Sequence, residues 1–228
     1  MPKTTPDPDQ PAKRKILIVD DHPVLRRGLA ALIESEPGLA VCGDVANCRA
    51  ALDAIRTSQP DLVIVDLVLE GCDGLDLVKD MKTRHPQIPA LVLSMHDEAV
   101  YAERSLRAGA QGYVTKQELD DTLLTAIHRL LDGEMYMSHK LEARLAAKFV
   151  TGRTLNTSLV LDALSDRELQ VFRLIGQGWS TRQIAETLHL SIKTIESHRE
   201  HIKQKLSIRS AAELAQRATQ WVETGQTG

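Results

Sequence analysis

The chain has 228 residues, of which 43% are hydrophobic and 26% are charged, a composition typical of a globular protein with one or two domains. Its net charge of −3 argues against nucleic acid as a partner of the molecule as a whole. Because no apolar run reaches the roughly 18 residues of a membrane helix, we expect no membrane association and a cytoplasmic location. Four prolines and no apolar stretch between Met1 and Arg14 exclude a secretory signal and predict a disordered lead.

The three cysteines, Cys42, Cys48 and Cys72, are too few and too irregularly spaced for a disulfide framework or a zinc site. We therefore expect all three to be free thiols.

Short apolar runs alternate with longer helical patterns in the first two thirds of the chain. The runs are unbroken, as expected for strands that are covered on both faces. They are Ile16–Val19, Ala40–Gly43, Leu62–Val65, Ala90–Leu93 and Gly112–Val114. Helical periodicity follows in segments such as Val24–Glu34, Leu75–Arg84 and Leu119–Leu131. Repeated β-α units predict a doubly wound, five-stranded parallel sheet, in which ligands bind at the carboxyl ends of the strands.

The pattern changes after Gly133. Leu141, Leu145 and Phe149 recur every four residues and predict a linker helix, and the polar stretch from Thr151 to Ser158 predicts a hinge. From Leu159 onward the sequence predicts helices only. Their starts are marked by capping pairs and a further serine cap, at Ser165 with Glu168, Ser180 with Gln183, Ser210 with Glu213, and Ser191. The chain is thus expected to comprise a lead (1–14), an α/β domain (15–137), a linker helix and hinge (138–160) and an all-α four-helix domain (161–228).

Polar residues follow several of the expected strands. Asp20 and Asp21 come directly after the first strand and Asp66 after the third, while Ser94 ends the fourth and Lys116 follows the fifth. In a flavodoxin-like sheet we expect the first, third and fifth strands to be neighbours, so that these groups converge on one rim.

Three carboxylates in one cleft repel each other unless a cation joins them. Oxygen ligands favour Mg²⁺, which leaves Asp66 able to act as a nucleophile that forms an aspartyl phosphate. The Lys116 ammonium would pair with the phosphoryl charge, and the Ser94 hydroxyl would donate to a phosphoryl oxygen after its loop moves inward. Each residue alone is also compatible with a structural role, as a turn aspartate, a cap or a surface lysine.

Residues Lys15 to Ser138 resemble the receiver domains of response regulators. The matching segments are Ile18 to His22, Pro60 to Asp66, Leu93-Ser94 and Ala108 to Lys116. The resemblance implies that Asp66 is the phosphoacceptor, that Asp20, Asp21, Asp66 and the backbone carbonyl of Val68 hold Mg²⁺, and that Ser94 and Tyr113 form a switch pair. The proline that the family often has after the phosphoacceptor is missing from Leu67 to Gly74. His22, beside the acidic pair, is interpreted as incidental.

Two alternatives to the receiver use the same residues. A Mg²⁺ phosphohydrolase of the haloacid dehalogenase type needs a second aspartate two positions after the nucleophile, where this chain has Val68. An interaction protein with a decayed aspartate site would have lost some of these groups, but all are present. Labelling with a small phosphodonor and Mg²⁺ distinguishes a stable aspartyl phosphate from turnover of organic phosphates.

The second domain contains a candidate DNA-reading helix. Ile184 to Ser191 predicts a helix that ends in a tight turn, and Ile192 to Leu206 predicts the next helix, with Ile195, Ile202 and Leu206 facing inward. A helix, a turn and a helix with a polar outer face is the helix-turn-helix arrangement, although a solvated helix or one that pairs with a protein has the same pattern. Between Ser191 and Arg209 five cations face two anions, a local charge of +3.

The expected contacts divide into two sets. Phosphates would be contacted by Arg182, Lys193, Thr194, Lys203 and Lys205. Base edges would be read by Glu196, Ser197, Arg199 and Glu200.

Residues Leu161 to Ala218 resemble the LuxR-type DNA-binding domain. The match includes Leu164 to Val171, Gly178, Ile184-Ala185, Thr194-Ile195 and Lys205-Leu206. A receiver followed by this domain is the architecture of the NarL/FixJ subfamily. The resemblance implies a phosphorylation-controlled transcription regulator, with a histidine kinase as donor, DNA with a two-fold site as target, and a homodimer as the phosphorylated form. Such a protein catalyses only its own phosphorylation and autodephosphorylation, and phosphorylation would act by favouring dimers or by freeing the 192–206 helix.

Overall fold

The computed structural model describes residues 12–69, 71–95, 98–139, 141–143, 146 and 163–225. The chain divides into two compact units, Met1–Leu141 and Glu142–Gly228, which are described separately. Residues 1–11 of the expected lead and most of the expected linker helix and hinge lie outside the described residues, whereas Arg14, the last residue of that lead, already belongs to the first strand. Within the described part, no helix has the length and apolar character needed to cross a membrane.

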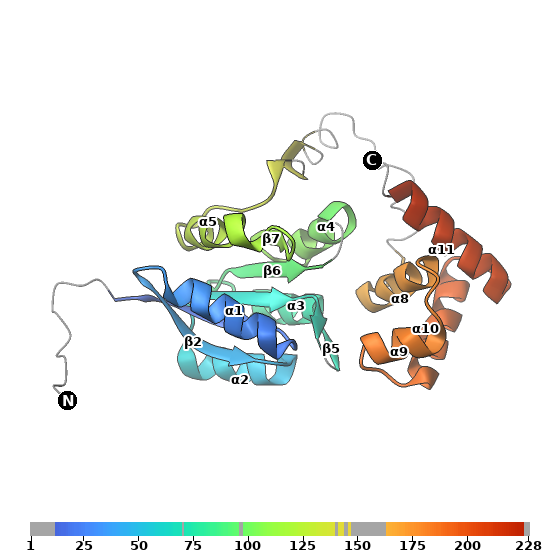
Figure 1. The fold of residues 1–228 in the computed structure, drawn as a ribbon, viewed down its shortest axis with the longest axis horizontal. Helices are drawn as coiled ribbons and strands as arrows, with labels where there is room; N and C mark the ends of the chain where they lie inside the picture. Colours follow the sequence, from blue (N-terminus) through green and yellow to red (C-terminus); the bar gives the residue numbers. More distant parts are fainter. Residues whose placement is uncertain are drawn as a thin grey trace. The chain divides into compact units, whose positions relative to one another are not determined.

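A five-stranded parallel sheet forms the centre of the first unit (Figure 1). Its strands are β1 (Arg14–Val19), β2 (Leu39–Val45), β3 (Leu62–Asp66), β6 (Ala90–Ser94) and β7 (Gly112–Thr115). Each contains one of the five apolar runs, so the predicted strands are confirmed. Their spatial order is β2-β1-β3-β6-β7. The expectation that the fifth strand lies beside the third is wrong, because β6 lies between β3 and β7.

Helices cover both faces of this sheet, which explains why its strands are continuously apolar. Helices α1 (Pro23–Glu34) and α5 (Leu119–Leu131) pack on one face. Helices α2 (Cys48–Ser58), α3 (Gly74–Arg84) and α4 (Glu98–Ala108) pack on the other. The core between α1, α5 and the sheet is aliphatic, and side chains such as Ile16, Ile64 and Ile127 are buried in it. This double-sided burial holds the carboxyl ends of the strands in fixed positions.

A small hairpin follows β3 directly. Strands β4 (Val68–Leu69) and β5 (Cys72–Asp73) pair antiparallel, with Gly71 at a φ of 74° in the turn. The side chain of Asp73 then accepts a hydrogen bond from the Leu75 backbone N–H and caps α3. The hairpin was not predicted, because strands of two residues show no periodicity.

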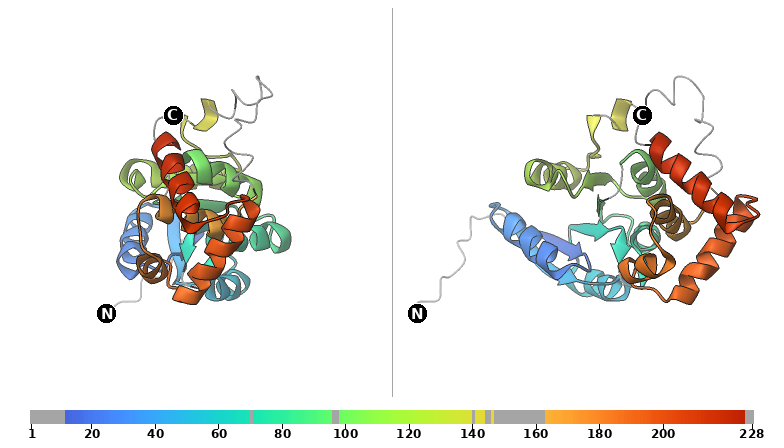
Figure 2. Two further views of the ribbon diagram at one scale, coloured as in Figure 1. Left: turned by 90° about the vertical axis from the view of Figure 1, so that its right-hand side faces the viewer. Right: turned by 45° about the vertical axis from the view of Figure 1, so that its right-hand side comes forward.

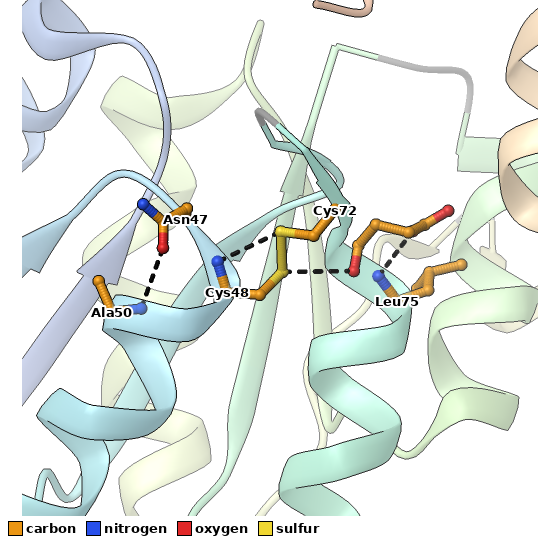
Figure 3. The surroundings of a disulfide bond; sticks show 6 residues. Asn47, Cys48, Ala50, Cys72 and Leu75 are labelled. Atoms are coloured by element: carbon orange, nitrogen blue, oxygen red, sulfur yellow. Dashed lines mark hydrogen bonds between the residues drawn. A yellow bond between two sulfur atoms is a disulfide. The ribbon is translucent and has the colours of Figure 1, made fainter. Parts of the chain in front are cut away.

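The hairpin also carries a covalent cross-link (Figure 3). Cys72 in β5 forms a disulfide with Cys48, the first residue of α2, with Cα atoms 6.3 Å apart. The expectation of three free thiols is therefore wrong for this pair and holds only for Cys42. Their separation of 24 residues gives no sign of pairing, since the contact arises only when α2 and the hairpin assemble on the sheet.

Four helices lie between residues 163 and 225 of the second unit, coloured orange to red in Figure 2. They are α8 (Asp166–Gly176), α9 (Thr181–Thr187), α10 (Ile192–Lys205) and α11 (Ala211–Gly225). Full capping boxes form at Ser165 and Ser180, as predicted, and Ser191 caps α10. At the start of α11 the capping box is incomplete. The Ser210 hydroxyl accepts a hydrogen bond from the Glu213 backbone N–H, but the Glu213 carboxylate accepts one from the Arg209 backbone N–H instead of that of Ser210.

Helix α8 is the centre of this unit and packs against α9, α10 and α11. Phe172 of α8 lies 5.8 Å from the Trp221 ring of α11, centroid to centroid. Gly176 lies so close to the backbone of α11 that an added Cβ would meet the Ala218 carbonyl oxygen at 2.3 Å. The inward residues of α10, Ile195 and Ile202, are fully buried, which confirms the predicted face and leaves its polar side outward.

Candidate functional site

The three predicted aspartates meet at the carboxyl edge of the sheet in the first unit. Asp20 follows β1 and Asp66 ends β3, and these two strands are hydrogen-bonded neighbours. Asp21 is the next residue along the chain from Asp20. Ligand oxygens of all three, with a ring nitrogen of His22, lie within 4.8 Å of one another.

Lys116 joins this group from beyond β7, across the intervening strand β6. Its Nζ lies 2.6 Å from Asp66 Oδ2 and 2.7 Å from Asp20 Oδ2, and the lysine side chain is 3% exposed. The Lys116 backbone N–H donates to the Ser94 carbonyl, which fixes the start of the lysine at the end of β6. The predicted convergence thus occurs, although the strand order that was expected to produce it is different.

Burial controls the charge of the central pair. Desolvation raises the pKa of Asp66 to about 6, reinforced by the Asp20 charge and opposed by Lys116. Burial alone would lower the pKa of Lys116, but the Asp66 and Asp20 carboxylates raise it above its ordinary value. The site therefore holds a charged lysine at neutral pH, beside a carboxylate that takes up a proton more readily than usual.

Asp21 shows that these residues fit a metal ion. Its side chain is 6% exposed, and among the described residues its Oδ2 has no partner and its Oδ1 has only the His22 ring nitrogen, 2.6 Å away. Buried carboxylate oxygens without a donor are costly unless a cation satisfies them. Oxygen atoms of Asp20, Asp21 and Asp66 form the donor set that Mg²⁺ prefers.

His22 lies closer to this site than its interpretation as incidental suggests. Its Nδ1 is 2.6 Å from Asp21 Oδ1 and its backbone N–H donates to Asp20 Oδ1. Arg26 of α1, which sequence reasoning missed, donates to the Asp20 backbone carbonyl and pairs with Asp44. Because Arg26 contacts the backbone of Asp20 rather than its side chain, no residue type in the sequence marked this contact.

The segment after Asp66 folds back over the phosphoacceptor candidate. The Val68 backbone N–H donates to Asp66 Oδ1 at 3.3 Å, and the Gly74 N–H donates to the Leu67 carbonyl. A Cβ at position 74 would meet the Asp66 carbonyl oxygen at 2.1 Å, so only glycine allows α3 to begin this close to the site. The hairpin therefore places Val68 next to the acidic cluster without the proline common in receivers.

Ser94 and Tyr113 lie on the neighbouring strands β6 and β7. Ser94 is fully buried at the end of β6 and pairs with Thr115. The Tyr113 side chain is 1% exposed, so its ring lies inside the fold.

In the second unit, α10 presents the predicted DNA-contacting residues outward. Lys193, Glu196, Ser197 and Glu200 are exposed, as is Arg182 on α9. Thr194 and Arg199 are half-buried, and the Thr194 hydroxyl is 2.8 Å from that of its cap, Ser191.

Two of the predicted phosphate contacts are engaged within the unit. Lys205 Nζ lies 2.6 Å from the buried Glu168 carboxylate of α8, and Lys203 Nζ lies 2.7 Å from Glu200. The second pair offsets one of the two negative charges on the outer face. Lys205 has a structural partner that the spacing along α10 did not reveal.

Two family models match the chain. The response regulator receiver domain matches residues 16–128, and the luxR family of bacterial regulatory proteins matches residues 162–218. Oxygen regulatory protein NreC of Staphylococcus aureus is 36% identical over 208 residues, which cover 90% of this chain and 96% of that protein. The NreC protein of Staphylococcus carnosus is 35% identical with the same coverage.

Solved structures of similar proteins indicate the same family. A LuxR-family two-component response regulator from Aurantimonas sp. SI85-9A1 is 34% identical, with a TM-score of 0.57 over 61% of this chain and 99% of that one. RcsB from Salmonella enterica serovar Typhimurium, bound to the promoter rprA in the presence of the phosphomimetic BeF3-, is 25% identical, with a TM-score of 0.59 over 91% of this chain and 98% of that one. The chain therefore belongs to the two-component response regulators of the NarL/FixJ subfamily, which join a receiver domain to a LuxR-type DNA-binding domain.

Proposed function

We propose that the chain is a phosphorylation-dependent transcription regulator whose receiver accepts a phosphoryl group on Asp66. The observation that supports this proposal most directly is the convergence of four side chains at one edge of the sheet, those of Asp20, Asp21, Asp66 and Lys116. The phosphodonor is a cognate histidine kinase, and the protein works in the cytoplasm. We propose four functional segments: a lead (1–14), the receiver (15–137), a linker helix and hinge (138–160) and the DNA-binding domain (161–228).

Mg²⁺ is the proposed cofactor, held by the carboxylates of Asp20, Asp21 and Asp66 and by the Val68 carbonyl. When bound, the ion neutralises charge on the phosphoryl oxygens during transfer. An oxygen of ionised Asp66 attacks phosphorus as the bond to the donor's imidazole nitrogen breaks. The Lys116 ammonium, now held between Asp66 and Asp20, then pairs with a phosphoryl oxygen. The receiver also catalyses its own dephosphorylation, in which water attacks phosphorus at the same site and releases inorganic phosphate and the Asp66 carboxylate.

The switch is proposed to run from Ser94 and Tyr113 to α4. A phosphoryl group on Asp66 draws the Ser94 hydroxyl inward, and the Tyr113 ring occupies the space behind it. Movement of α4 then favours a homodimer or frees α10, and mass measurement separates these two routes.

DNA is the proposed target, read by α10 from two copies on a two-fold site. Phosphates are contacted by Arg182, Lys193, Thr194, Lys203 and Lys205, and base edges by Glu196, Ser197, Arg199 and Glu200. The structures of RcsB as dimers bound to DNA support this arrangement by family likeness. The exposure of Lys193, Glu196 and Arg182 is what such contacts require.

The test is incubation of the full chain with radiolabelled acetyl phosphate and Mg²⁺. We expect an acid-stable, alkali-labile label that is absent from Asp66→Asn. Asp61→Asn, at the amino end of the same strand, is the matched control and should retain the label. The labelled chain should then bind mapped genomic sites more tightly than the unlabelled one. Full labelling of Asp66→Asn, or equal DNA affinity and mass in both states, would refute the proposal.

A further inference from the structure

The disulfide between Cys48 and Cys72 lies next to the candidate phosphorylation site. Cys72 is six residues beyond Asp66, in the hairpin that carries Val68, and Cys48 begins α2. Figure 3 shows the bond bridging the start of α2 and the segment that leads into α3. The cross-link therefore ties the loop after the phosphoacceptor to a separate helix of the same face.

The surroundings of the two sulfur atoms also suit their reduced forms. The Cys48 backbone N–H, at the first turn of α2, donates to Cys72 Sγ at 3.2 Å, so it would stabilise a Cys72 thiolate. Cys48 Sγ lies 3.7 Å from the Asp73 carbonyl oxygen, which would accept a hydrogen bond from a Cys48 thiol. Both cysteines are half-buried, so a small thiol reagent can reach them.

Compartment chemistry favours a transient bond, an argument that depends on the proposed function. A DNA-binding regulator works where glutathione keeps thiols reduced, and disulfides formed there are usually sensing or catalytic. A purely structural role would require the bond to survive that environment.

We propose that Cys48 and Cys72 form a reversible redox-modification site that sets how firmly the loop after Asp66 is held, and with it the affinity of the acidic cluster for Mg²⁺. The oxidant is a small disulfide such as glutathione disulfide. The Cys72 thiolate attacks one of its sulfurs and expels one glutathione thiolate. Cys48, as it loses its proton, attacks the mixed disulfide and releases the second glutathione. Two protein thiols and one glutathione disulfide thus give one protein disulfide and two glutathione thiols.

The loop is anchored by the buried side chains of Leu67 and Leu69 and by the Asp73 cap of α3, and the disulfide adds a covalent restraint to a short ladder. Strands β4 and β5 contain two residues each, and a hairpin of that size is marginal by itself. With the bond closed, the Val68 N–H contact to Asp66 and the Gly74 contact to Leu67 are held in one arrangement. With the disulfide reduced, the loop samples several arrangements, and only one of them suits Mg²⁺ binding. Ordering the loop then costs free energy when Mg²⁺ binds, so the affinity for the ion is lower.

The first experiment equilibrates the full chain with glutathione buffers of graded composition, followed by acid quenching, alkylation and mass spectrometry. We expect the Cys48–Cys72 pair to convert between bond and two thiols across the range that glutathione maintains in cells. Cys42→Ser should behave as the unchanged chain, because burial raises the pKa of the Cys42 thiol and lowers its reactivity. Cys48→Ser should stop at a mixed disulfide on Cys72. A pair that stays entirely reduced, or entirely oxidised, over this range overturns the proposal.

The second experiment measures Mg²⁺ binding calorimetrically in the oxidised and reduced chains. Reduction should weaken binding by about three- to tenfold. The double variant Cys48→Ser, Cys72→Ser should match the reduced chain whatever the glutathione ratio, and equal affinities in both redox states overturn the coupling. Labelling of Asp66 is followed in parallel. A chain that binds Mg²⁺ but is labelled in neither redox state contradicts the proposed function, whereas a labelled chain without redox dependence contradicts only this inference.

Discussion

The ammonium of Lys116 lies 2.6 Å from Asp66 Oδ2, although 50 residues separate them in the chain. The same nitrogen contacts Asp20, so one cation is shared by two buried carboxylates. This arrangement leaves the three aspartates with more negative charge than Lys116 alone can neutralise. The electrostatics of the receiver therefore lead to predictions that need no kinase.

Asp66→Asn should stabilise the receiver at neutral pH. The pKa of Asp66 in the folded chain, about 6, lies above its ordinary 3.8, so the free energy of unfolding decreases as pH rises through this window. Removing the ionised group should raise the free energy of unfolding at pH 7 by roughly 1–3 kcal/mol and leave little difference at pH 4. Calorimetric unfolding without Mg²⁺ measures this. Asp53→Asn, on the exposed side of α2, should have no such effect; a destabilised Asp66→Asn chain would contradict the charge argument.

Lys116→Met should destabilise the receiver and make it depend on Mg²⁺. Removing one partner from a buried ionic group leaves uncompensated charge, which costs about 3 kcal/mol. Added Mg²⁺ should restore part of the loss, because a divalent ion supplies the missing positive charge. Thermal unfolding with and without Mg²⁺ checks both effects, with the exposed Lys79→Met as the control. An equal loss of stability with and without Mg²⁺ would contradict the idea that Lys116 and the ion neutralise the same carboxylates.

Mg²⁺ affinity should fall below about pH 6. A proton on Asp66 competes with the ion, and the pKa of this carboxyl is about 6 in the metal-free chain. Each pH unit below that value should weaken binding by up to about tenfold. Calorimetric titration from pH 7.5 to 5 measures the slope. Asp66→Asn should bind more weakly at pH 7.5 with a flatter slope, and an unchanged slope would mean that another group takes up the proton.

Lys193→Ala and Lys205→Ala should have different effects, although both lysines lie on α10. Lys193 is exposed, so its loss should weaken DNA binding and reduce the salt slope by about 1 without changing stability. Lys205 pairs with Glu168, which is 4% exposed, so its loss should destabilise the helical unit by about 1 kcal/mol in addition to removing a proposed phosphate contact.

Both tryptophans, Trp179 and Trp221, lie in this unit, so tryptophan fluorescence follows its unfolding alone. Burial opposes ionisation of Glu168, but contacts from Lys205 and the Ser165 backbone lower its pKa below the ordinary value. Stability from this group is therefore present above pH 4.5 and lost as pH falls further. The stability difference between Lys205→Ala and the unchanged chain should disappear in acid; a difference that persists there would exclude this ion pair as its source.

The sequence predicted the elements better than the contacts between them. Apolar runs such as Leu62–Val65 locate strands because both faces of the sheet are covered, and serine caps locate helix starts because they satisfy local N–H groups. Strand order, the Cys48–Cys72 bond and the Lys205–Glu168 pair depend on segments that meet only after folding. The acidic site was predictable because residues at the carboxyl ends of parallel strands share an edge whatever the order of the strands.

The contact between Asp20 and Lys116 spans 96 residues of sequence and exists only when β1, β3, β6 and β7 are aligned. A growing polypeptide on the ribosome, or a truncated fragment, contains the aspartates long before it has the lysine. The charge balance at Asp66 is thereby tied to completion of the whole sheet. Under the proposed function, an incompletely synthesised molecule would lack this charge balance and would not accept a phosphoryl group.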